Sequence, residues 1–407
     1  MQSKPLDKDL ENYFIKYLRI ISLTLIMGMF VSSAVVQICI ALFFPATITI
    51  YVQKFRNKHC SQMDWLLLFM FLSGVASVLL STDSRLSFHS LPRHGLLLTA
   101  IPLSFLFNKD ESISLKFVFF LIAAGGFISG FAGTINYFST GERAYGLFAG
   151  YYTLASLLTF SSLISFGLLF SVPAKFSIAI VFSLLVQLTA LWFTYTRSAY
   201  LGVIIGLIAG VLIFYYFFKK NNLKSKFIPA ALFVAIAILI LISVFSNDNV
   251  RINPISIFNG DQKQNDFSSG RLSLYMESAK VFSSNWENAE IIKLLLGRGL
   301  NSRMIIYPES SFTSWESDYI ESFMNQGLIG VILLIAIYYI FFQSLVKTLK
   351  PISSQVDFGL VIGILMAGVG FWIISFFSSQ MIGQNSSAYF AIMIASFEKL
   401  KTDFINN

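Results

Sequence analysis

The chain of 407 residues is 56% hydrophobic and only 12% charged, and its net charge is +8. Soluble domains devote about a quarter of their residues to Asp, Glu, Lys and Arg, so this composition excludes a water-soluble globular protein. The two cysteines, Cys39 in an apolar run and Cys60 in a basic stretch, exclude a disulfide framework or a cysteine metal cluster.

Apolar runs of around twenty residues follow one another along the chain, and this is the length that a bilayer core of about 30 Å requires of a helix. They predict an all-α polytopic membrane protein with about twelve spans, because lipid leaves every backbone polar group to be satisfied inside a helix. The predicted spans are 19–34, 36–52, 64–81, 95–107, 117–137, 146–170, 176–193, 199–217, 228–246, 327–346, 357–378 and 384–398. Between the ninth and tenth spans, the long hydrophilic stretch 247–326 predicts one large loop.

The distribution of lysine predicts the orientation, because short cytoplasmic loops retain Lys and Arg. With the N-terminus inside, only Lys263, Lys280 and Lys293 among the lysines would face outward. We therefore expect cytoplasmic tails at 1–18 and 399–407, and the large loop on the outer side. The positive charge is then an orientation signal and predicts no nucleic-acid partner.

The short outer loops carry arginine and no lysine, at Arg85, Arg93, Arg143 and Arg197. Arginine offers a planar, permanently charged fork that suits phosphate, so these loops predict an outward-facing anion site. Each arginine has a simpler interpretation as a headgroup anchor. Arg197, in the stretch Thr-Tyr-Thr-Arg-Ser-Ala-Tyr at 194–200, is the first candidate, with capping of the preceding helix as its alternative.

Two helices and a tight turn are predicted within the large loop. One helix spans Arg271 to Phe282 and another Ala289 to Leu296. The apolar face of the first would comprise Leu272, Tyr275, Met276, Ala279 and Phe282. The paired glycines Gly297 and Gly299 allow a turn with close backbone approach, and the arginines that flank it would add positive charge.

A cluster of carboxylates, Glu316, Asp318 and Glu321, comes shortly before the tenth span. A carboxylate among apolar and aromatic neighbours suits a general base, although a solvated acidic helix face is the simpler interpretation. The three histidines show no spacing typical of a metal site. We expect neither a metal nor another cofactor.

Four stretches, in the same order along the chain, resemble motifs of the bacterial O-antigen ligase and O-antigen polymerase superfamily. They are Arg-Ala-Tyr-Gly-Leu-Phe at 143–148, the stretch 194–200, Arg271–Phe282 with the later glycine pair, and Tyr-Ile-Glu at 319–321 before Gly327 to Gly330. The resemblance implies a GT-C-like glycosyltransferase of the bacterial inner membrane with a large periplasmic loop. Its donor would be an undecaprenyl-diphosphate-linked saccharide and its acceptor a glycan or lipid A-core, and a chain-length regulator is a further candidate partner.

The resemblance also implies roles for individual residues. Arg197 and Arg271, with Arg143 as a third candidate, would bind the pyrophosphate of the lipid donor. Glu316 stands where the family has a histidine that acts as the base, and Asp318 is the alternative base. The missing histidine favours a polymerase, and the alternative is a ligase in which Glu316 or Asp318 replaces it. A lipid-linked oligosaccharide flippase or another secondary transporter is the alternative function, although such proteins usually carry ionisable residues at mid-membrane.

The orientation leads to a labelling prediction. A cysteine introduced at position 260, in the large loop, should react with an impermeant maleimide in intact spheroplasts, because this loop is expected outside. Cysteines at 57 and 222 should react only after the membrane is permeabilised. Labelling of position 222 from outside would contradict the orientation.

Overall fold

The computed structural model describes residues 8–147, 150–221, 271–310, 313–349, 355–380 and 386–406. Within these ranges the chain forms helices and no β-strand, so the predicted all-α class is confirmed. The helices are α1 Lys8–Val31, α2 Ser33–Arg56, α3 Gln62–Leu79, α4 Ser84–His94, the 3-10 helix η1 Gly95–Thr99, α5 Ala100–Lys109, α6 Leu115–Thr140, α7 Tyr151–Ser171, α8 Ala174–Phe193, α9 Arg197–Asn221, α11 Arg271–Glu287, α12 Ile291–Leu296, α13 Ser302–Ile306, α14 Asp318–Leu349, α15 Gln355–Ser375 and α16 Ser387–Asn406.

Nine of the described helices are long and apolar enough to cross a membrane, which confirms a polytopic membrane protein. The other three predicted spans have different outcomes. The span at 95–107 is divided between η1 and α5, and the one at 384–398 falls on α16, which is not among the nine. The span at 228–246 lies outside the described residues.

Helices α7 and α15 form the centre of the bundle. In their apolar stretches 94% and 83% of the residues are buried, whereas the share in the other seven is at most 50%. A Cβ atom added to Gly167 on α7 would clash with Gly363 and Gly359 on α15, so the two backbones are in close contact. Small residues allow this approach where no hydrophobic effect drives helices together in lipid.

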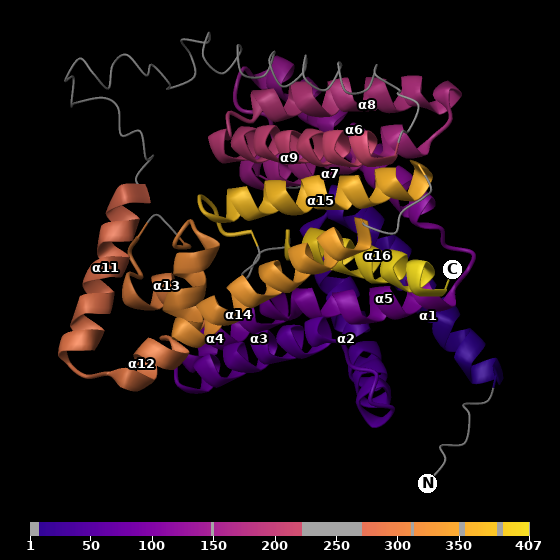
Figure 1. Cartoon of the computed structure of the whole chain (residues 1–407). Coiled ribbons are helices and arrows are strands. Elements are labelled where there is room, and N and C mark those ends of the chain that lie inside the picture. Colours follow the sequence, from indigo (N-terminus) through magenta and orange to yellow (C-terminus); the bar gives the residue numbers. More distant parts are fainter. Residues whose placement is uncertain are drawn as a thin grey trace.

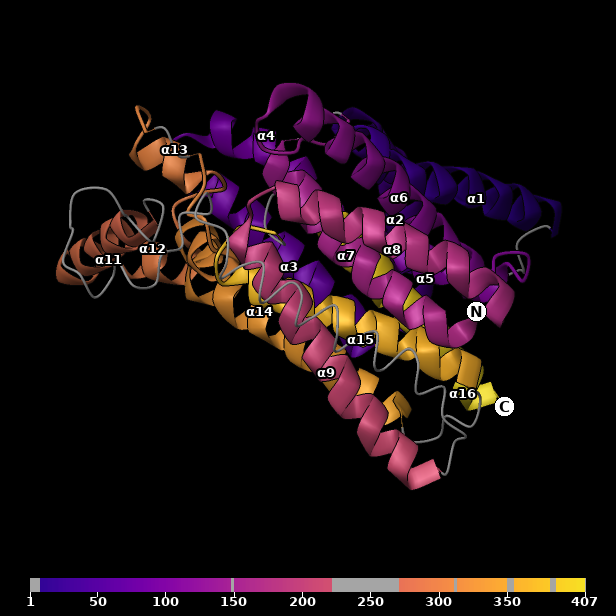
Figure 2. The same cartoon turned by 90° about the horizontal axis from the view of Figure 1, so that it is seen from above.

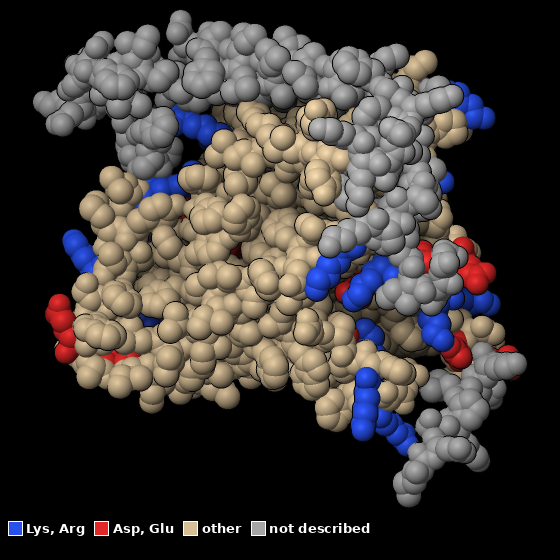
Figure 3. Space-filling model, viewed as in Figure 1, with Lys and Arg blue, Asp and Glu red and all other residues tan. Residues whose placement is uncertain are grey.

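The two ends of the molecule differ in the segments that form them and in their charge. Figures 1 and 2 show both chain termini at one end and the helices α11, α12 and α13 at the opposite end. In Figure 3, Lys and Arg side chains gather near the end that holds the termini, and the face between the ends is almost entirely uncharged. This arrangement is the one that the lysine pattern predicts, and the assignment of the termini to the cytoplasm stays a prediction.

Helix α14 is broken near its beginning, at Gly327, whose φ of 67° and ψ of −161° are not helical. The predicted division between loop and tenth span falls at this break, so the last turns of the predicted loop, 318–326, are helical. A Cβ atom on Gly327 would clash with the backbone of Leu295 in α12. The break therefore brings α12 against the entrance of the span.

The predicted helices of the large loop are present as α11 and α12, but the predicted apolar face of α11 is wrong. Leu272, Met276 and Phe282 are exposed, whereas Leu274 and Val281 are buried. The reason is that periodicity identifies apolar positions on a helix but not the side on which its neighbours lie. The stretch 247–270, predicted as the start of the loop, lies outside the described residues.

Substitution of Gly327 should test the break. Alanine at this position would meet the Leu295 carbonyl and adopt a backbone conformation that only glycine accepts readily. We expect Gly327→Ala to destabilise the protein by about 2 kcal/mol or more, measured as a lower melting temperature in detergent. Gly150→Ala is the control, because no atom of the described residues lies within 4 Å of a Cβ atom there. Equal melting of both variants would contradict this account.

Candidate functional site

A polar cavity of about 140 Å³ lies where three separate segments meet. The beginning of α7 contributes Tyr152 and Thr153, and the segment before α14 contributes Ser314 and Glu316. The connection that follows α15 contributes Gln380 and its neighbours. We call this space the central cavity, and it holds one of the two carboxylates proposed from sequence as a base.

Glu316 and Arg271 face each other at the central cavity. The Arg271 Nη2 atom lies 3.6 Å from Glu316 Oε2, and the side chains are 18% and 19% exposed. Glu316 also accepts a hydrogen bond of 3.0 Å from the Ser314 hydroxyl. Its φ of 53° is in the left-handed region, which a residue other than glycine seldom occupies. Such local strain is typical of functional positions, because the surrounding structure must hold it.

A row of tyrosines leads from this ion pair to Arg143. The Arg143 guanidinium lies 4.7 Å from the centre of the Tyr151 ring, and that ring lies 4.3 Å from the ring of Tyr152. Tyr152 is within electrostatic range of both Arg271 and Glu316. Arg143 makes no ion pair with any residue that the structure describes. The site thus has two cations, one paired with a carboxylate and one on an aromatic ring.

Arg197 begins α9, directly after the tight turn that follows α8, and is half-buried. In this turn Tyr195 has a φ of 53°, and its hydroxyl lies 3.1 Å from that of Tyr137. The hydrogen bond with Tyr137 and, next, burial raise the pKa of Tyr195 to about 12, against the opposing charge of Arg143. Arg143 and the turn are therefore neighbours, although Arg197 does not line the central cavity.

Two side chains that the sequence did not single out line the central cavity with unsatisfied polar atoms. Gln380 is 4% exposed and Ser379 is 6% exposed. Within the described part of the chain, neither the Gln380 Oε1 atom nor the Ser379 hydroxyl has a hydrogen-bond partner. Buried polar atoms without partners are uncommon, so both are available to a ligand. The signal in the sequence was the polar stretch Ser378–Gln380 after an apolar span.

Asp318 lies behind the cavity and not in it. Its side chain is fully buried, and its Oδ1 atom accepts a hydrogen bond of 2.8 Å from the backbone N–H of Gln380. This bond joins residues 62 positions apart in the sequence. In this geometry Asp318 holds the connection after α15 against the start of α14, so it is placed to position Gln380.

The glycine pair connects the loop to the break in α14. Gly297 and Gly299 have φ values of 78° and 108°. The N–H groups of Arg298 and Gly299 donate to the carbonyls of Met324 and Asn325 at 2.9 and 3.3 Å. A Cβ atom on Gly297 would clash with the Asn325 carbonyl. The pair thus allows a close backbone approach inside the protein.

The arginines beside this turn were expected to add charge for a ligand, and the structure pairs them internally. Arg298 donates to Asn285 and lies 3.2 Å from Glu290. Arg303 is 3% exposed, forms an ion pair with Glu277, and lies against the rings of Tyr307 and Trp315. Both therefore stabilise the loop.

A buried hydrogen-bond network holds the segment that precedes Glu316. The Trp315 N–H donates to Glu321 Oε2 at 2.7 Å, and its indole N–H donates to the Ser302 hydroxyl at 2.9 Å. Asn325 donates to Glu321 Oε1 at 2.7 Å and accepts from the Ser302 hydroxyl at 2.7 Å. Glu321 thus serves the framework, and among the three predicted carboxylates Glu316 is the one that lines the central cavity.

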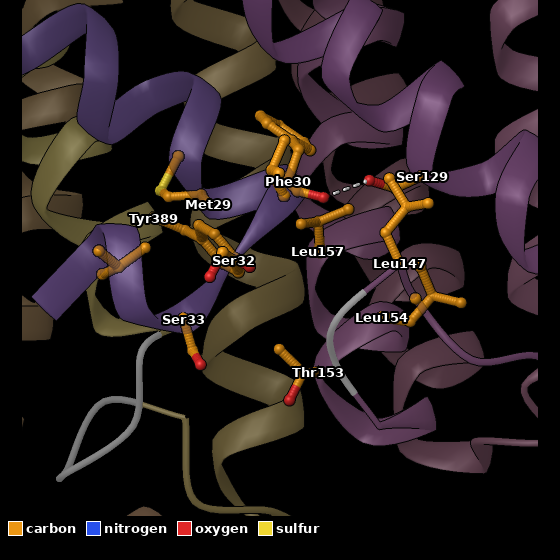
Figure 4. Close-up of a pocket in the computed structure, with 13 residues that line it drawn as sticks. Met29, Phe30, Ser32, Ser33, Ser129, Leu147, Thr153, Leu154, Leu157 and Tyr389 are labelled. Atoms are coloured by element: carbon orange, nitrogen blue, oxygen red, sulfur yellow. Dashed lines mark hydrogen bonds between the residues drawn. The ribbon is translucent and has the colours of Figure 1, made fainter.

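The wall of the central cavity at Thr153 also borders a smaller cavity of about 30 Å³. Figure 4 shows Thr153 near Ser33, with Leu154 and Leu157 on the same helix, below the turn between α1 and α2. A water molecule occupies about 30 Å³ of liquid. This second space therefore has room for water, and the turn between α1 and α2 lines it.

The donor set of the site consists of oxygen, amide and guanidinium groups. Among the described residues, no group of three or more His, Cys, Asp or Glu side chains is arranged to hold a metal ion. His94 is buried, and its Nε2 atom lies 3.1 Å from the Met70 carbonyl and 2.9 Å from Gln326 Nε2. Burial lowers its pKa, against the opposing effect of the Met70 carbonyl. His94 thus packs α4 against α3.

A family model described as O-antigen ligase matches residues 178–335. The matched segment contains Arg197, Arg271 and Glu316, but neither Arg143 nor Gln380. No curated protein matches the chain. The central cavity is thus formed partly by the matched segment and partly by helices on either side of it.

The position of Asp318 generates a stability prediction. Asp318→Ala leaves the Gln380 N–H without its acceptor, at a cost of about 1–3 kcal/mol, so its melting temperature should fall. Asp318→Asn keeps an acceptor oxygen and should remain closer to the wild type. Asp403→Ala, which removes an ion pair at a 42% exposed carboxylate, should have the smallest effect. A wild-type melting temperature for Asp318→Ala would contradict the positioning role.

Proposed function

We propose that this chain, which carries an O-antigen ligase domain at residues 178–335, is a glycosyltransferase of the bacterial inner membrane. It moves a saccharide from undecaprenyl diphosphate onto an acceptor at the periplasmic face, as in the polymerisation of O-antigen or its ligation to lipid A-core. The family match supports a ligase-type or polymerase-type transferase. The choice of this donor is our inference.

The observation that carries the proposal is the ion pair of Arg271 and Glu316. Both side chains are mostly buried, and they lie at a polar cavity of a bundle with membrane-spanning helices. A separation of 3.6 Å is longer than the 2.7–2.9 Å of a good charge-assisted hydrogen bond. Exchange of this partner for a diphosphate therefore costs little. The exchange would offset part of the negative charge of the donor and release the Glu316 carboxylate for proton transfer.

The transfer step then follows from the groups at hand. The acceptor hydroxyl oxygen forms a bond to the anomeric carbon of the donor sugar, and the bond from that carbon to the phosphate oxygen breaks. The diphosphate leaves with the electron pair, and guanidinium groups stabilise its charge. The hydroxyl proton passes to Glu316. A positioned base of this kind contributes about 10²- to 10⁴-fold to the rate.

Arg143 and Arg197 are the further candidates for the diphosphate. Arg143 lies on the Tyr151 ring without an ion pair to a described residue, and Arg197 follows the turn beside it. Asp318 is the weaker candidate for the base, because it is fully buried and bonded to Gln380. We propose that both termini are cytoplasmic and that a chain-length regulator is a partner if the product is a polymer.

The alternative function, a flippase or other secondary transporter, makes a different prediction for the same purified protein. A transporter would move the lipid-linked saccharide without changing its covalent structure. A transferase yields longer or transferred glycans in detergent, where no compartment exists. Formation of product in detergent therefore separates the two functions.

Substitution of Glu316 tests the proposed base. Glu316→Gln keeps the shape of the side chain and removes its basicity, so glycan transfer should fall by about 10²- to 10⁴-fold while binding of undecaprenyl diphosphate is retained. The measurement is product formation from a lipid-linked saccharide by the purified protein. Normal transfer by Glu316→Gln would exclude this residue as the base.

Two further variants accompany Glu316→Gln: one is its control, and the other tests the Arg271 guanidinium group. Glu309→Gln makes the same chemical change at an exposed position of the same loop and should transfer at the wild-type rate. Arg271→Lys keeps the charge but loses the planar fork, so it should weaken binding of undecaprenyl diphosphate. Full binding by Arg271→Lys would contradict recognition through the guanidinium group.

A further inference from the structure

A second, larger cavity of about 230 Å³ lies beside the central cavity, between α4 and the loop before α14. Ser90 and Arg93 of α4 line one side of it, and Asn301 and Met304 line another. We call it the outer cavity. Since one water molecule occupies about 30 Å³ of liquid, this space holds several waters or a group of similar total volume.

The outer and central cavities share a wall. Thr313 and Ser314 line both, and the Ser314 hydroxyl donates to Glu316 Oε1 at 3.0 Å. A ligand in the outer cavity is therefore separated from the Glu316 carboxylate by a single residue. This arrangement suits a second substrate whose hydroxyl approaches the donor in the central cavity.

The outer cavity has uncharged polar groups that the protein itself does not use. Ser90 is 7% exposed, and its hydroxyl makes no hydrogen bond to a described residue. The side-chain amide of Asn301 likewise has no partner among the described residues. Glu321 and Asn325 also line the cavity. Their hydrogen bonds with Trp315 and Ser302 hold these two side chains in place.

Both cavities have hydroxyl and amide groups, and they differ in the charged groups beside them. The central cavity has the Arg271 guanidinium at its carboxylate, which suits an anion. The outer cavity offers a hydroxyl and an amide, each of which both donates and accepts hydrogen bonds. Such groups suit the many hydroxyls of a sugar. Arg93 is exposed and makes no ion pair with a described residue, so it is available to a ligand that enters.

We propose that the outer cavity binds the acceptor saccharide, through hydrogen bonds from Ser90 and Asn301 to sugar hydroxyls. The proposal rests on the proposed glycosyl transfer and names the site of its second substrate. The acceptor hydroxyl reaches past Ser314 to Glu316, and the donor diphosphate stays on the Arg271 side.

The test uses full-length protein in which Cys39 and Cys60 are replaced by alanine. The Asn301→Cys variant is labelled with a bulky maleimide, and Glu287→Cys, at an exposed position of α11, is the labelled control. Glycan transfer from lipid-linked saccharide is measured, together with binding of undecaprenyl diphosphate by native mass spectrometry. We expect the label at 301 to lower transfer at least about 100-fold and to leave binding of undecaprenyl diphosphate unchanged.

A second measurement reports binding without turnover. The saccharide released from the lipid-linked donor by mild acid should slow labelling of the Asn301→Cys variant and not of the Glu287→Cys variant. Ser90→Ala should raise the KM for the acceptor about 3- to 10-fold, as expected for one lost hydrogen bond. If the Asn301→Cys variant melts early, Ser90→Cys replaces it in the labelling.

The outcomes separate the two proposals. Full transfer by completely labelled Asn301→Cys protein, or no protection by the saccharide, would overturn the outer cavity as the acceptor site. Loss of undecaprenyl diphosphate binding on labelling would also overturn it, because the two sites would then not be separate. If unlabelled protein neither binds undecaprenyl diphosphate nor transfers glycan, the proposed function fails, whatever the saccharide protection shows.

Discussion

The structure of the site depends on one backbone contact, between the Gly297–Gly299 turn and the end of the first part of α14. The Arg298 and Gly299 N–H groups bond to carbonyls of residues 324 and 325, and the Ser77 hydroxyl donates to the Asn325 carbonyl as well. These carbonyls are the ones that the break at Gly327 leaves without a full set of helical partners. The contact therefore provides hydrogen-bond donors for these helix carbonyls, and it also fixes the loop to the membrane bundle.

The position of Glu316 follows from this contact. Because 318–326 is held in place, Glu321 and Asn325 can bond to Trp315 and Ser302, and Trp315 becomes fully buried. A buried tryptophan with both of its N–H groups bonded fixes the backbone next to it. Glu316 is the next residue, and this restraint accounts for a left-handed conformation that the chain would not adopt alone. The Glu316 carboxylate is thus directed toward Arg271 by groups that do not line the central cavity.

The sequence predicted the features that depend on local pattern. The apolar runs predicted the class of protein, and the loop helices α11 and α12 were placed correctly because helical periodicity and boundaries are local. The pairing of Arg271 with Glu316 was not foreseen, although both residues were named. Contacts between distant segments, such as Asp318 with Gln380 or Ser302 with Asn325, produce no regular residue spacing from which the sequence could predict them. The arginines beside the glycine pair were misjudged for the same reason, since their carboxylate partners belong to other helices.

The backbone contact at residues 297–299 and 324–325 has a consequence for how the loop can change. It closes a loop whose ends are fixed, and the entropy cost of closure grows only with the logarithm of length, about 0.6 kcal/mol for each doubling. Residues added at the exposed stretch around Pro308 and Glu309 would therefore scarcely affect stability. One residue added between Gly297 and Gly299 would shift the two hydrogen bonds out of register. The loop can therefore lengthen around residues 308–309, whereas the turn at Gly297 and Gly299 is held to a fixed length.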